Sequence, residues 1–395
     1  MLNYTYFMRL IKATKHFRLH GHSYEDFPLI VDSEMDLVRE VHQFLIYFCI
    51  TRGRVESKNT WWRYGQDLYD YFGYLEGRGL DWRSRLATSQ HSVIAAYRDW
   101  SVSLGLSSKT INGRLRTIIQ FYQFAYRKHW IESVPYDIET VVINKQKGFL
   151  AHTDKSGNRK STANVMLKEK VAALQILTKQ EVKTLMNHPC FISQHLIYRL
   201  ALQTGMRKEE LLTFPGNYIQ DPKTKRGQAI VPVVLRSKDM EVKSGQGGTK
   251  GNKERTIHIP IGLYEQLWQY KLHERNHLLM RNEISEQRAL LLNRFGQPYS
   301  IKGSVLNNEL KKIVGRKDIS LHKLRHTYAT FKLYGLRNSP NYRGEPLVYV
   351  QDRLGHSSII TTQIYLHYLE DLEGDLMTEY DQDIDLICEE AKGVA

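Results

Sequence analysis

Four short segments of the sequence place cationic or imidazole side chains next to glycines or at the expected starts of helices. In T-G-M-R-K-E-E-L-L, Arg207 follows Gly205 in the opening turn of a predicted helix, and Glu210 comes three residues later. In G-T-K-G-N-K-E-R-T-I-H-I-P, Lys250 lies between glycines in a turn that leads to a predicted strand beginning near Arg255. Alone, an Arg and a Glu at this spacing are usually a weak surface ion pair, and a lysine in a turn is a polar hairpin tip.

The other two segments add histidines, an arginine and a tyrosine. In H-K-L-R-H-T-Y-A-T, His322, Arg325 and His326 fall on overlapping faces of one helical turn. In L-G-H-S-S-I-I-T-T-Q-I-Y, His356 lies in a predicted turn, and Tyr365 follows nine residues later. A single tyrosine on a helix is usually a packing residue with a hydrated hydroxyl. The four segments taken together are a far more specific indication of a chemical site than any one of them.

A metal site is the alternative that the two histidines of the third segment raise. His322 and His326 are four residues apart, as in zinc proteases, but those enzymes need a Glu directly after the first His, and Lys323 occupies that place. No cysteine or acidic pair nearby completes a tetrahedral site. We therefore expect no metal here, and we interpret His326 as a core imidazole or one that supports other side chains.

The first part of the chain has the pattern of a small all-helical unit. From Ser33 to about Trp130, apolar residues recur at helical spacing, with breaks near Gly53, at Gly77 to Gly79 and near Gly105. The clearest predicted helix starts after Ser107 or Ser108 and carries an apolar stripe from Ile111 to Tyr126. This pattern predicts a helical core that packs on itself.

The second part is predicted to be α-rich with one small antiparallel sheet. Structure resumes at Leu177, where Thr178 and Glu181 have the spacing of a capping box. Residues 228–261 are β-branched and turn-rich, with apolar runs at 230–235 and 256–259, and the rest is helical. The fold class expected for the whole chain is therefore mainly α with a small antiparallel β-sheet.

The predicted division has four parts. An N-terminal extension occupies residues 1–32, a helical unit 33–142, a basic linker 143–172, and a second domain 173–395. The last residues of that domain, 368–395, form an acidic tail with ten acidic residues and one lysine.

Charge and cysteine usage limit the classes of partner and compartment. The net charge is +14, and the tail contributes −9, so the rest of the chain carries +23. Such a surplus favours nucleic acid or an anionic membrane as the partner. Three scattered cysteines match neither a disulfide framework nor a zinc knuckle. The cysteine usage favours a reducing cytosol, and no apolar run approaches the ~18 residues of a membrane helix. We therefore expect a soluble, unexported cytoplasmic protein with no membrane partner.

In this order and spacing, the four segments resemble the active-site boxes of the tyrosine recombinase family, which includes phage integrases and Xer-type resolvases. The resemblance spans roughly Leu177 to His367, and the helical unit before it resembles the SAM-like core-binding domain of that family. It implies a two-domain clamp on DNA, made of a helical core-binding domain and an α+β catalytic domain.

The resemblance implies a role for each residue of the boxes. Arg207 and Arg325 match the pair that clamps the scissile phosphate, which suits guanidinium groups because they bind phosphate oxygens in pairs and stay charged. Tyr365 matches the nucleophile. Lys250 matches the general acid that protonates the leaving 5′ oxygen, and Lys253 is its competitor for that role.

The remaining positions have less direct roles in the family. His322 and His356 match the positions that donate to the phosphate or manage the tyrosine proton. Glu210 matches an acidic support for an arginine or for His322, and His326 is a further supporting residue.

The implied reaction is the site-specific cleavage and rejoining of duplex DNA through a 3′-phosphotyrosine, with no metal or nucleotide cofactor. The expected partners are double-stranded DNA, further copies of the chain as a dimer to tetramer on DNA, and a possible DNA-bending accessory protein. The expected role is the integration or excision of a mobile element. The alternatives are a type IB topoisomerase, a telomere-resolvase-like enzyme, and a catalytically silent architectural DNA-binding protein.

The sequence departs from the family pattern in two places. The connection at residues 335–346 is longer than the compact family form, and we interpret it as a surface insertion. The stretch 221–248 is also long, which predicts an extended sheet before Lys250.

Overall fold

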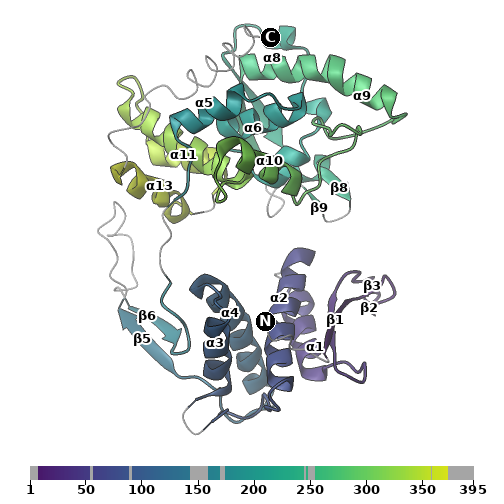
Figure 1. Cartoon of the computed structure of the whole chain (residues 1–395), viewed down its shortest axis with the longest axis vertical. Coiled ribbons are helices and arrows are strands. Elements are labelled where there is room, and N and C mark those ends of the chain that lie inside the picture. The colour runs from purple at the N-terminus through teal and green to yellow at the C-terminus, as the bar shows by residue number, and fades with distance from the viewer. Residues whose placement is uncertain are drawn as a thin grey trace. The chain divides into compact units, whose positions relative to one another are not determined.

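The structure is a computed structural model that describes residues 8–53, 57–88, 91–142, 159–169, 174–243, 246–247, 254–356 and 358–371. The chain folds into two compact units, Met1–Val171 and Ala172–Ala395 (Figure 1). Each unit has a hydrophobic core of its own.

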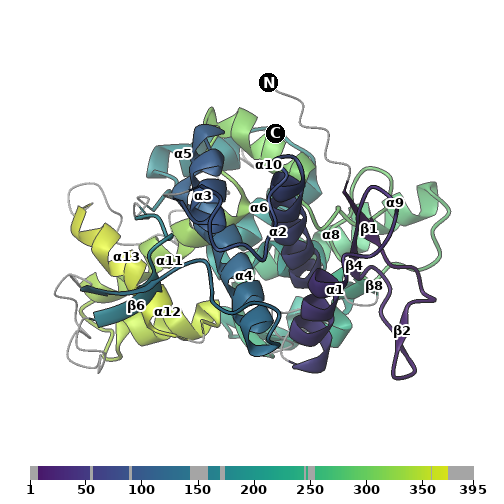
Figure 2. The same cartoon turned by 90° about the horizontal axis from the view of Figure 1, so that it is seen from below.

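The first unit begins with β-strands. Strand β1 (Arg9–Lys12) pairs antiparallel with β4 (Pro28–Val31), and β2 (Arg18–Leu19) pairs with β3 (His22–Ser23). The β1–β4 pair lies against the helices α1 and α2 (Figure 2). The segment that the sequence marks only as an extension is therefore folded onto the helical core.

Helices make up most of this core. They are α1 (Arg39–Leu45), its π-helical continuation η1 (Ile46–Thr51), α2 (Lys58–Glu76), α3 (Val93–Ser103) and α4 (Ser108–Arg127). The hydroxyl of Ser107 caps α4 by accepting from the backbone N–H of Thr110, as Ser and Thr caps commonly do. Gly53, Gly79 and Gly105 have φ of 59°, 62° and 76°, a left-handed conformation that glycine adopts without strain. The predicted helix breaks are confirmed at these positions.

The chain after α4 forms a second hairpin and then returns to α4. Strand β5 (Ile138–Val142) pairs with β6 (Arg159–Ala163). The amide of Asn112 donates to the carbonyl of Leu167 at 2.8 Å and accepts from its N–H at 2.9 Å. The interval predicted as a linker, 143–172, therefore contains a strand and a segment fixed to the first unit, while 143–158 and 170–173 lie outside the described residues.

The second unit is mainly helical. Its helices are α5 (Lys179–Asn187), α6 (Ile192–Thr204), α7 (Lys208–Leu212), α8 (Ile261–Tyr270), the π-helical η7 (Lys271–Arg275), α9 (Asn276–Arg281), α10 (Ser304–Val314), α11 (Leu321–Asn338), α12 (Pro346–Leu354) and α13 (Ile360–Asp371). Short 3-10 turns are η3 (Gly216–Tyr218), η4 (Pro222–Lys225) and η5 (Ser237–Asp239). The predicted capping box of Thr178 and Glu181 is confirmed at the start of α5.

The strands of this unit form small antiparallel sheets. Strand β7 (Ile230–Leu235) pairs with β10 (Arg255–Pro260), with Leu235 opposite Arg255 and Ile230 opposite Pro260. A second pair consists of β8 (Glu241–Lys243) and β9 (Gln246–Gly247). These sheets lie beside a helical majority, so the predicted fold class is confirmed.

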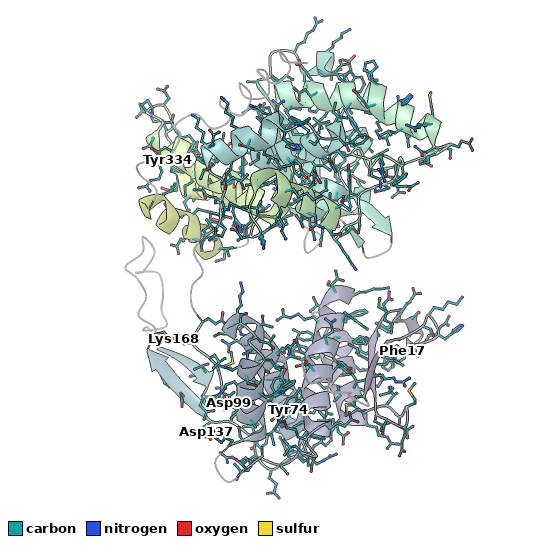
Figure 3. The ribbon with its side chains drawn as sticks, in the orientation of Figure 1. Phe17, Tyr74, Asp99, Asp137, Lys168 and Tyr334 are labelled. Atoms are coloured by element: carbon teal, nitrogen blue, oxygen red, sulfur yellow. The ribbon has the colours of Figure 1, made fainter. Side chains whose placement is uncertain are left out.

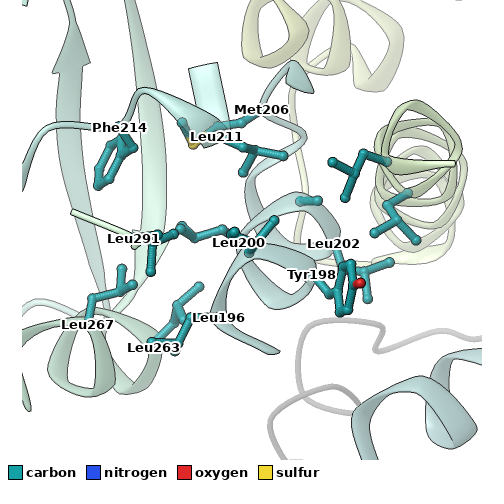
Figure 4. Close-up of a cluster of buried hydrophobic side chains, with 14 of the residues drawn as sticks. Leu196, Tyr198, Leu200, Leu202, Met206, Leu211, Phe214, Leu263, Leu267 and Leu291 are labelled. Atoms are coloured by element: carbon teal, nitrogen blue, oxygen red, sulfur yellow. The ribbon is translucent and has the colours of Figure 1, made fainter. Parts of the chain in front are cut away.

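Helix α6 runs through the centre of the second core. It contacts α7, α8, α11 and β10, and its Leu196, Leu200 and Leu202 pack among the side chains of these elements (Figure 4). Burial of this kind stabilises the fold by about 25 cal/mol per Å² of apolar surface. Of these elements, α7, β10 and α11 carry or adjoin three of the chemical segments, and α11 in turn contacts α12 and α13, which carry the fourth. No helix within the described ranges is long and apolar enough to cross a membrane.

Candidate active site

Arg207 lies at the start of α7, directly after a left-handed turn. Gly205 ends α6 with φ 62°, and a Cβ there would lie 2.4 Å from Cδ1 of Tyr328, so the turn requires glycine. The Arg207 guanidinium donates to Oε1 of Glu210 at 3.0 Å and to the carbonyl of Gly355 at 2.8 Å. The first chemical segment is thus joined to the fourth.

Arg325 joins three of the segments from the centre of the site. Its side chain is 2% exposed and donates at 2.6 Å to the carbonyls of both Gly205 and Leu354. Burial, with repulsion from Arg207 and Arg255, lowers the pKa of Arg325 to about 9. The guanidinium therefore remains charged at neutral pH, and its charge is fixed beside α13.

Arg255 is a residue of the site that the sequence reasoning missed. It lies on β10, its side chain is 7% exposed, and it forms an ion pair with Glu210 and a hydrogen bond to the carbonyl of Arg353. The sequence marks Arg255 only as the start of a strand, and no local pattern shows that it faces a buried carboxylate. Glu210 therefore holds two arginines in place, Arg207 and Arg255.

The two neighbouring arginines, Arg207 and Arg255, determine the protonation state of Glu210. Its side chain is fully buried, which works to raise the pKa of the carboxyl. Hydrogen bonds and charge from Arg255 and Arg207 outweigh burial and hold the pKa of Glu210 below its ordinary value. The carboxylate is therefore ionised and able to orient both guanidinium groups.

The three histidines lie around these arginines as neutral rings. The rings of His322 and His326 meet edge to face, with centroids 4.6 Å apart on α11. His356 lies between α12 and α13, with Nδ1 3.0 Å from the hydroxyl of Thr362. Burial and the neighbouring cations lower the pKa of His322, and they lower that of His326 to about 3 and that of His356 to about 4. Neutral imidazoles can each donate one hydrogen bond and accept another.

Tyr365 lies on α13 with its hydroxyl inside the protein. The residue is 1% exposed, and its hydroxyl oxygen is 2.8 Å from Nδ1 of His326. Burial raises the pKa of Tyr365 to about 12, and the charge of Arg325 offsets part of that rise. The phenol is protonated at neutral pH and held by the histidine that the sequence ranks only as a supporting residue.

Two predicted features lie outside what the structure describes. Lys250 and Lys253 precede β10 but fall in the gap before Glu254, so the position of the general acid stays a prediction. The acidic tail after Asp371 is outside the described residues as well. Within the described ranges, no group of three or more His, Cys, Asp or Glu residues is arranged to hold a metal ion.

Comparison with protein families gives two matches in chain order. Residues 41–129 match the N-terminal SAM-like domain of phage integrases, and residues 175–371 match the phage integrase family model. The second match includes all four chemical segments, and the first runs from within α1 to just past the end of α4.

Curated relatives and solved structures extend along most of the chain. Tyrosine recombinase XerC of Halalkalibacterium halodurans is 26% identical over 84% of this chain and 93% of that protein. Tyrosine recombinase XerD of Staphylococcus epidermidis is 27% identical over 83% of this chain and 93% of that protein.

Two solved structures share the fold at lower identity. XerH site-specific recombinase bound to palindromic difH substrate superposes with a TM-score of 0.51 at 16% identity, covering 85% of this chain and 93% of that one. The Tn1549 transposon integrase in complex with transposon right end DNA gives 0.52 at 16% identity, covering 85% of this chain and 99% of that one. The chain therefore belongs to the phage integrase family of tyrosine-type site-specific DNA recombinases.

Proposed function

We propose that Tyr365 is the nucleophile of this recombinase, and that Arg207 and Arg325 bind the scissile phosphate that it attacks. The observation that carries this proposal is the position of the Tyr365 phenol. The phenol is buried where the positive charge of Arg325 acts on it, and its oxygen lies 2.8 Å from Nδ1 of His326. A fixed positive charge beside a phenol favours the phenolate that forms during attack.

The reaction is a transesterification at phosphorus. The Tyr365 oxygen forms a bond to phosphorus and passes its proton to a neutral imidazole of the site, His322 or His356, while the bond from phosphorus to the 5′ oxygen breaks. Lys250, or Lys253 in its place, gives a proton to that leaving oxygen. A 3′-phosphotyrosine and a free 5′-hydroxyl result, and a 5′-hydroxyl of the partner strand reverses the step to rejoin the DNA.

The arginines and histidines stabilise the charge that builds up on the phosphate oxygens. Guanidinium groups suit this task because each presents paired donors and stays charged at the working pH. His322 and His356, as neutral rings with lowered pKa values, donate hydrogen bonds to the same oxygens. Glu210 acts one step away, because it orients Arg207 and Arg255.

We assign His326 a positioning role in the resting protein. The Tyr365 residue is only 1% exposed and its hydroxyl is bound to His326, so Tyr365 has to leave His326 before it attacks a phosphate that arrives from solution. The hydrogen bond between them therefore stabilises a resting conformation in which Tyr365 is held away from the phosphate. We call this conformation the stored form of the nucleophile.

The substrate of this chemistry is duplex DNA, bound by several copies of the chain. The recombinases and integrases of similar fold are described in complex with DNA, one of the similar structures being a λ integrase dimer on a core site, and this supports assembly of a dimer or tetramer on the duplex. We further propose that the chain integrates or excises a mobile element in the prokaryotic cytoplasm, and that a DNA-bending accessory protein assists it.

A nicked duplex tests the catalytic proposal. Cleavage of such a substrate loses a short strand, so the covalent complex is trapped and stays on the DNA in denaturing gels. Duplexes taken from the DNA that flanks the gene are the substrates to use. We expect a trapped complex with the natural protein and none with Tyr365→Phe, while binding of the intact duplex remains. Equal loss of binding and trapping would contradict the assignment.

A further inference from the structure

The chain carries a β-hairpin in front of the segment that matches the family's SAM-like domain. That match starts at residue 41, whereas β1 and β4 form the stem of a hairpin from Arg9 to Val31, with β2 and β3 at its tip. Backbone hydrogen bonds from Ala13 to Phe27 at 2.8 Å and from Tyr24 to Phe17 at 2.9 Å connect stem and tip.

A tight turn closes the tip. His20 and Gly21 have φ of 48° and 82°, and two left-handed residues in sequence are typical of the two-residue turns that favour twisted hairpins. The hairpin is therefore a defined structure up to its end, where His20 and Gly21 form the turn between β2 and β3.

The inner face of the hairpin is anchored in the core of the first unit. Phe27 is fully buried, its ring centre is 5.8 Å from that of Trp61 on α2, and it stacks on Phe17, which Figure 3 labels on the hairpin. Pro28 lies so close to α2 that a Cβ on Gly65 would be 2.4 Å from it. Packing of this kind fixes the direction in which the outer face points.

The exposed hairpin residues before Glu25 carry positive charge only. The sequence has no Asp or Glu before Glu25, and the exposed residues before it include four cations and three histidines: Arg9, Lys12, Lys15, His16, Arg18, His20 and His22.

The carboxylate of Asp26 neutralises only one of these cations, Lys12. Asp26 forms ion pairs with Lys12 at 3.1 Å and with Lys58 of α2 at 3.3 Å, and the hydrogen bond from Lys12 helps to lower the pKa of Asp26. Within the described part of the chain, no acidic side chain forms an ion pair with Arg9, Lys15 or Arg18. Their charge is directed to solvent.

We propose that this hairpin is an additional DNA-binding element, which places Arg9, Lys15 and Arg18 on the phosphate backbone of duplex DNA outside the contacts of the helical domain. The inference rests on the proposed function, because the recombinase has to hold a duplex. Cations that are exposed, unpaired and mounted on an anchored hairpin bind a polyanion with little loss of conformational entropy. A two-stranded ribbon is also narrow enough to enter the major groove.

The salt dependence of DNA binding tests this inference. The variant Arg9→Ala/Lys15→Ala/Arg18→Ala is titrated against a labelled duplex of about 40 base pairs of arbitrary sequence, between about 50 and 200 mM salt. Each lost phosphate contact lowers the slope of log K against log salt by about 0.9, so we expect a reduction of about 3. The matched control Arg9→Lys/Arg18→Lys keeps all charges and is expected to keep the slope of the natural protein.

The outcomes separate this inference from the catalytic proposal. If the triple variant folds as the natural protein by circular dichroism but keeps its full slope, the hairpin does not bind phosphate and the inference is wrong. A changed oligomeric state with an unchanged slope would assign the hairpin to a protein partner, which also overturns it. Trapping of the covalent complex at low salt should persist in the triple variant. Loss of trapping in the natural protein would instead contradict the catalytic proposal.

Discussion

Replacement of His326 by phenylalanine should release the stored nucleophile. Phenylalanine keeps a flat ring of similar size on α11 but removes the nitrogen that lies 2.8 Å from the Tyr365 hydroxyl. The control is His326→Asn, because its amide can place a donor or an acceptor near the position of Nδ1. The two variants differ in whether the buried hydroxyl retains a hydrogen-bond partner.

The size of the effect follows from the burial of Tyr365. A buried polar group left without a partner costs about 1–3 kcal/mol. The free energy of unfolding of the second unit should fall by about that amount, which corresponds to a midpoint lower by roughly 2–4 °C per kcal/mol for a unit of this size. The same loss raises the free energy of the resting conformation of Tyr365 relative to the attacking conformation, which lowers the barrier to attack. A barrier lower by about 1.4 kcal/mol corresponds to a rate about ten times higher.

Two assays decide the question. Thermal unfolding measures the stability of each variant, and the rate at which the covalent complex appears on a nicked duplex at saturating protein measures release of the nucleophile. We expect His326→Phe to be less stable and about ten times faster, and His326→Asn to match the natural protein in both respects. A slower His326→Phe would show that His326 assists the attacking hydroxyl, and that result would refute the storage role.

Three further predictions concern the charged groups of the site. Arg325→Lys should lower the free energy of unfolding by about 2–3 kcal/mol in urea titrations, because one ammonium does not span the carbonyls of Gly205 and Leu354, and trapping should fall by about 100-fold or more. Glu210→Gln should cost about 3–5 kcal/mol in the same titrations, since it leaves buried arginines without a counter-charge; a cost below about 1 kcal/mol would contradict the pairing. The pKa of His326 is about 3 in the folded protein against 6.5 ordinarily, so the unfolded chain binds more protons and stability should fall as the pH drops from about 6.5 toward 3. Urea titrations across that range should show a shallower fall in His326→Phe, and an identical fall would count against the lowered pKa.

Local patterns predicted those features that depend on neighbours in sequence. The capping box at Thr178, the helix breaks at glycines and the strand pair at 230–235 follow from periodicity and turn chemistry within a few residues. The resemblance to active-site boxes drew attention to Arg207, Arg325 and Tyr365 in the same way, because each box is a short segment.

Contacts between distant segments are what the sequence did not predict. Arg325 donates to a carbonyl 120 residues earlier in the chain, and Arg255 meets Glu210 across 45 residues. No periodicity encodes such pairs, because they depend on how α6, α11 and β10 pack. The basic hairpin was overlooked for a related reason, since its strands are only two to four residues long and its apolar side chains depend on α2 for burial.

The identity of the residue that becomes linked to DNA is the most direct test of the whole account. The trapped complex from a nicked duplex is digested with a protease and a nuclease, and the peptide that retains a nucleotide is sequenced by mass spectrometry. The account predicts that the nucleotide is attached through its 3′ phosphate to the oxygen of Tyr365. Attachment to another residue, or a 5′ linkage, would contradict it.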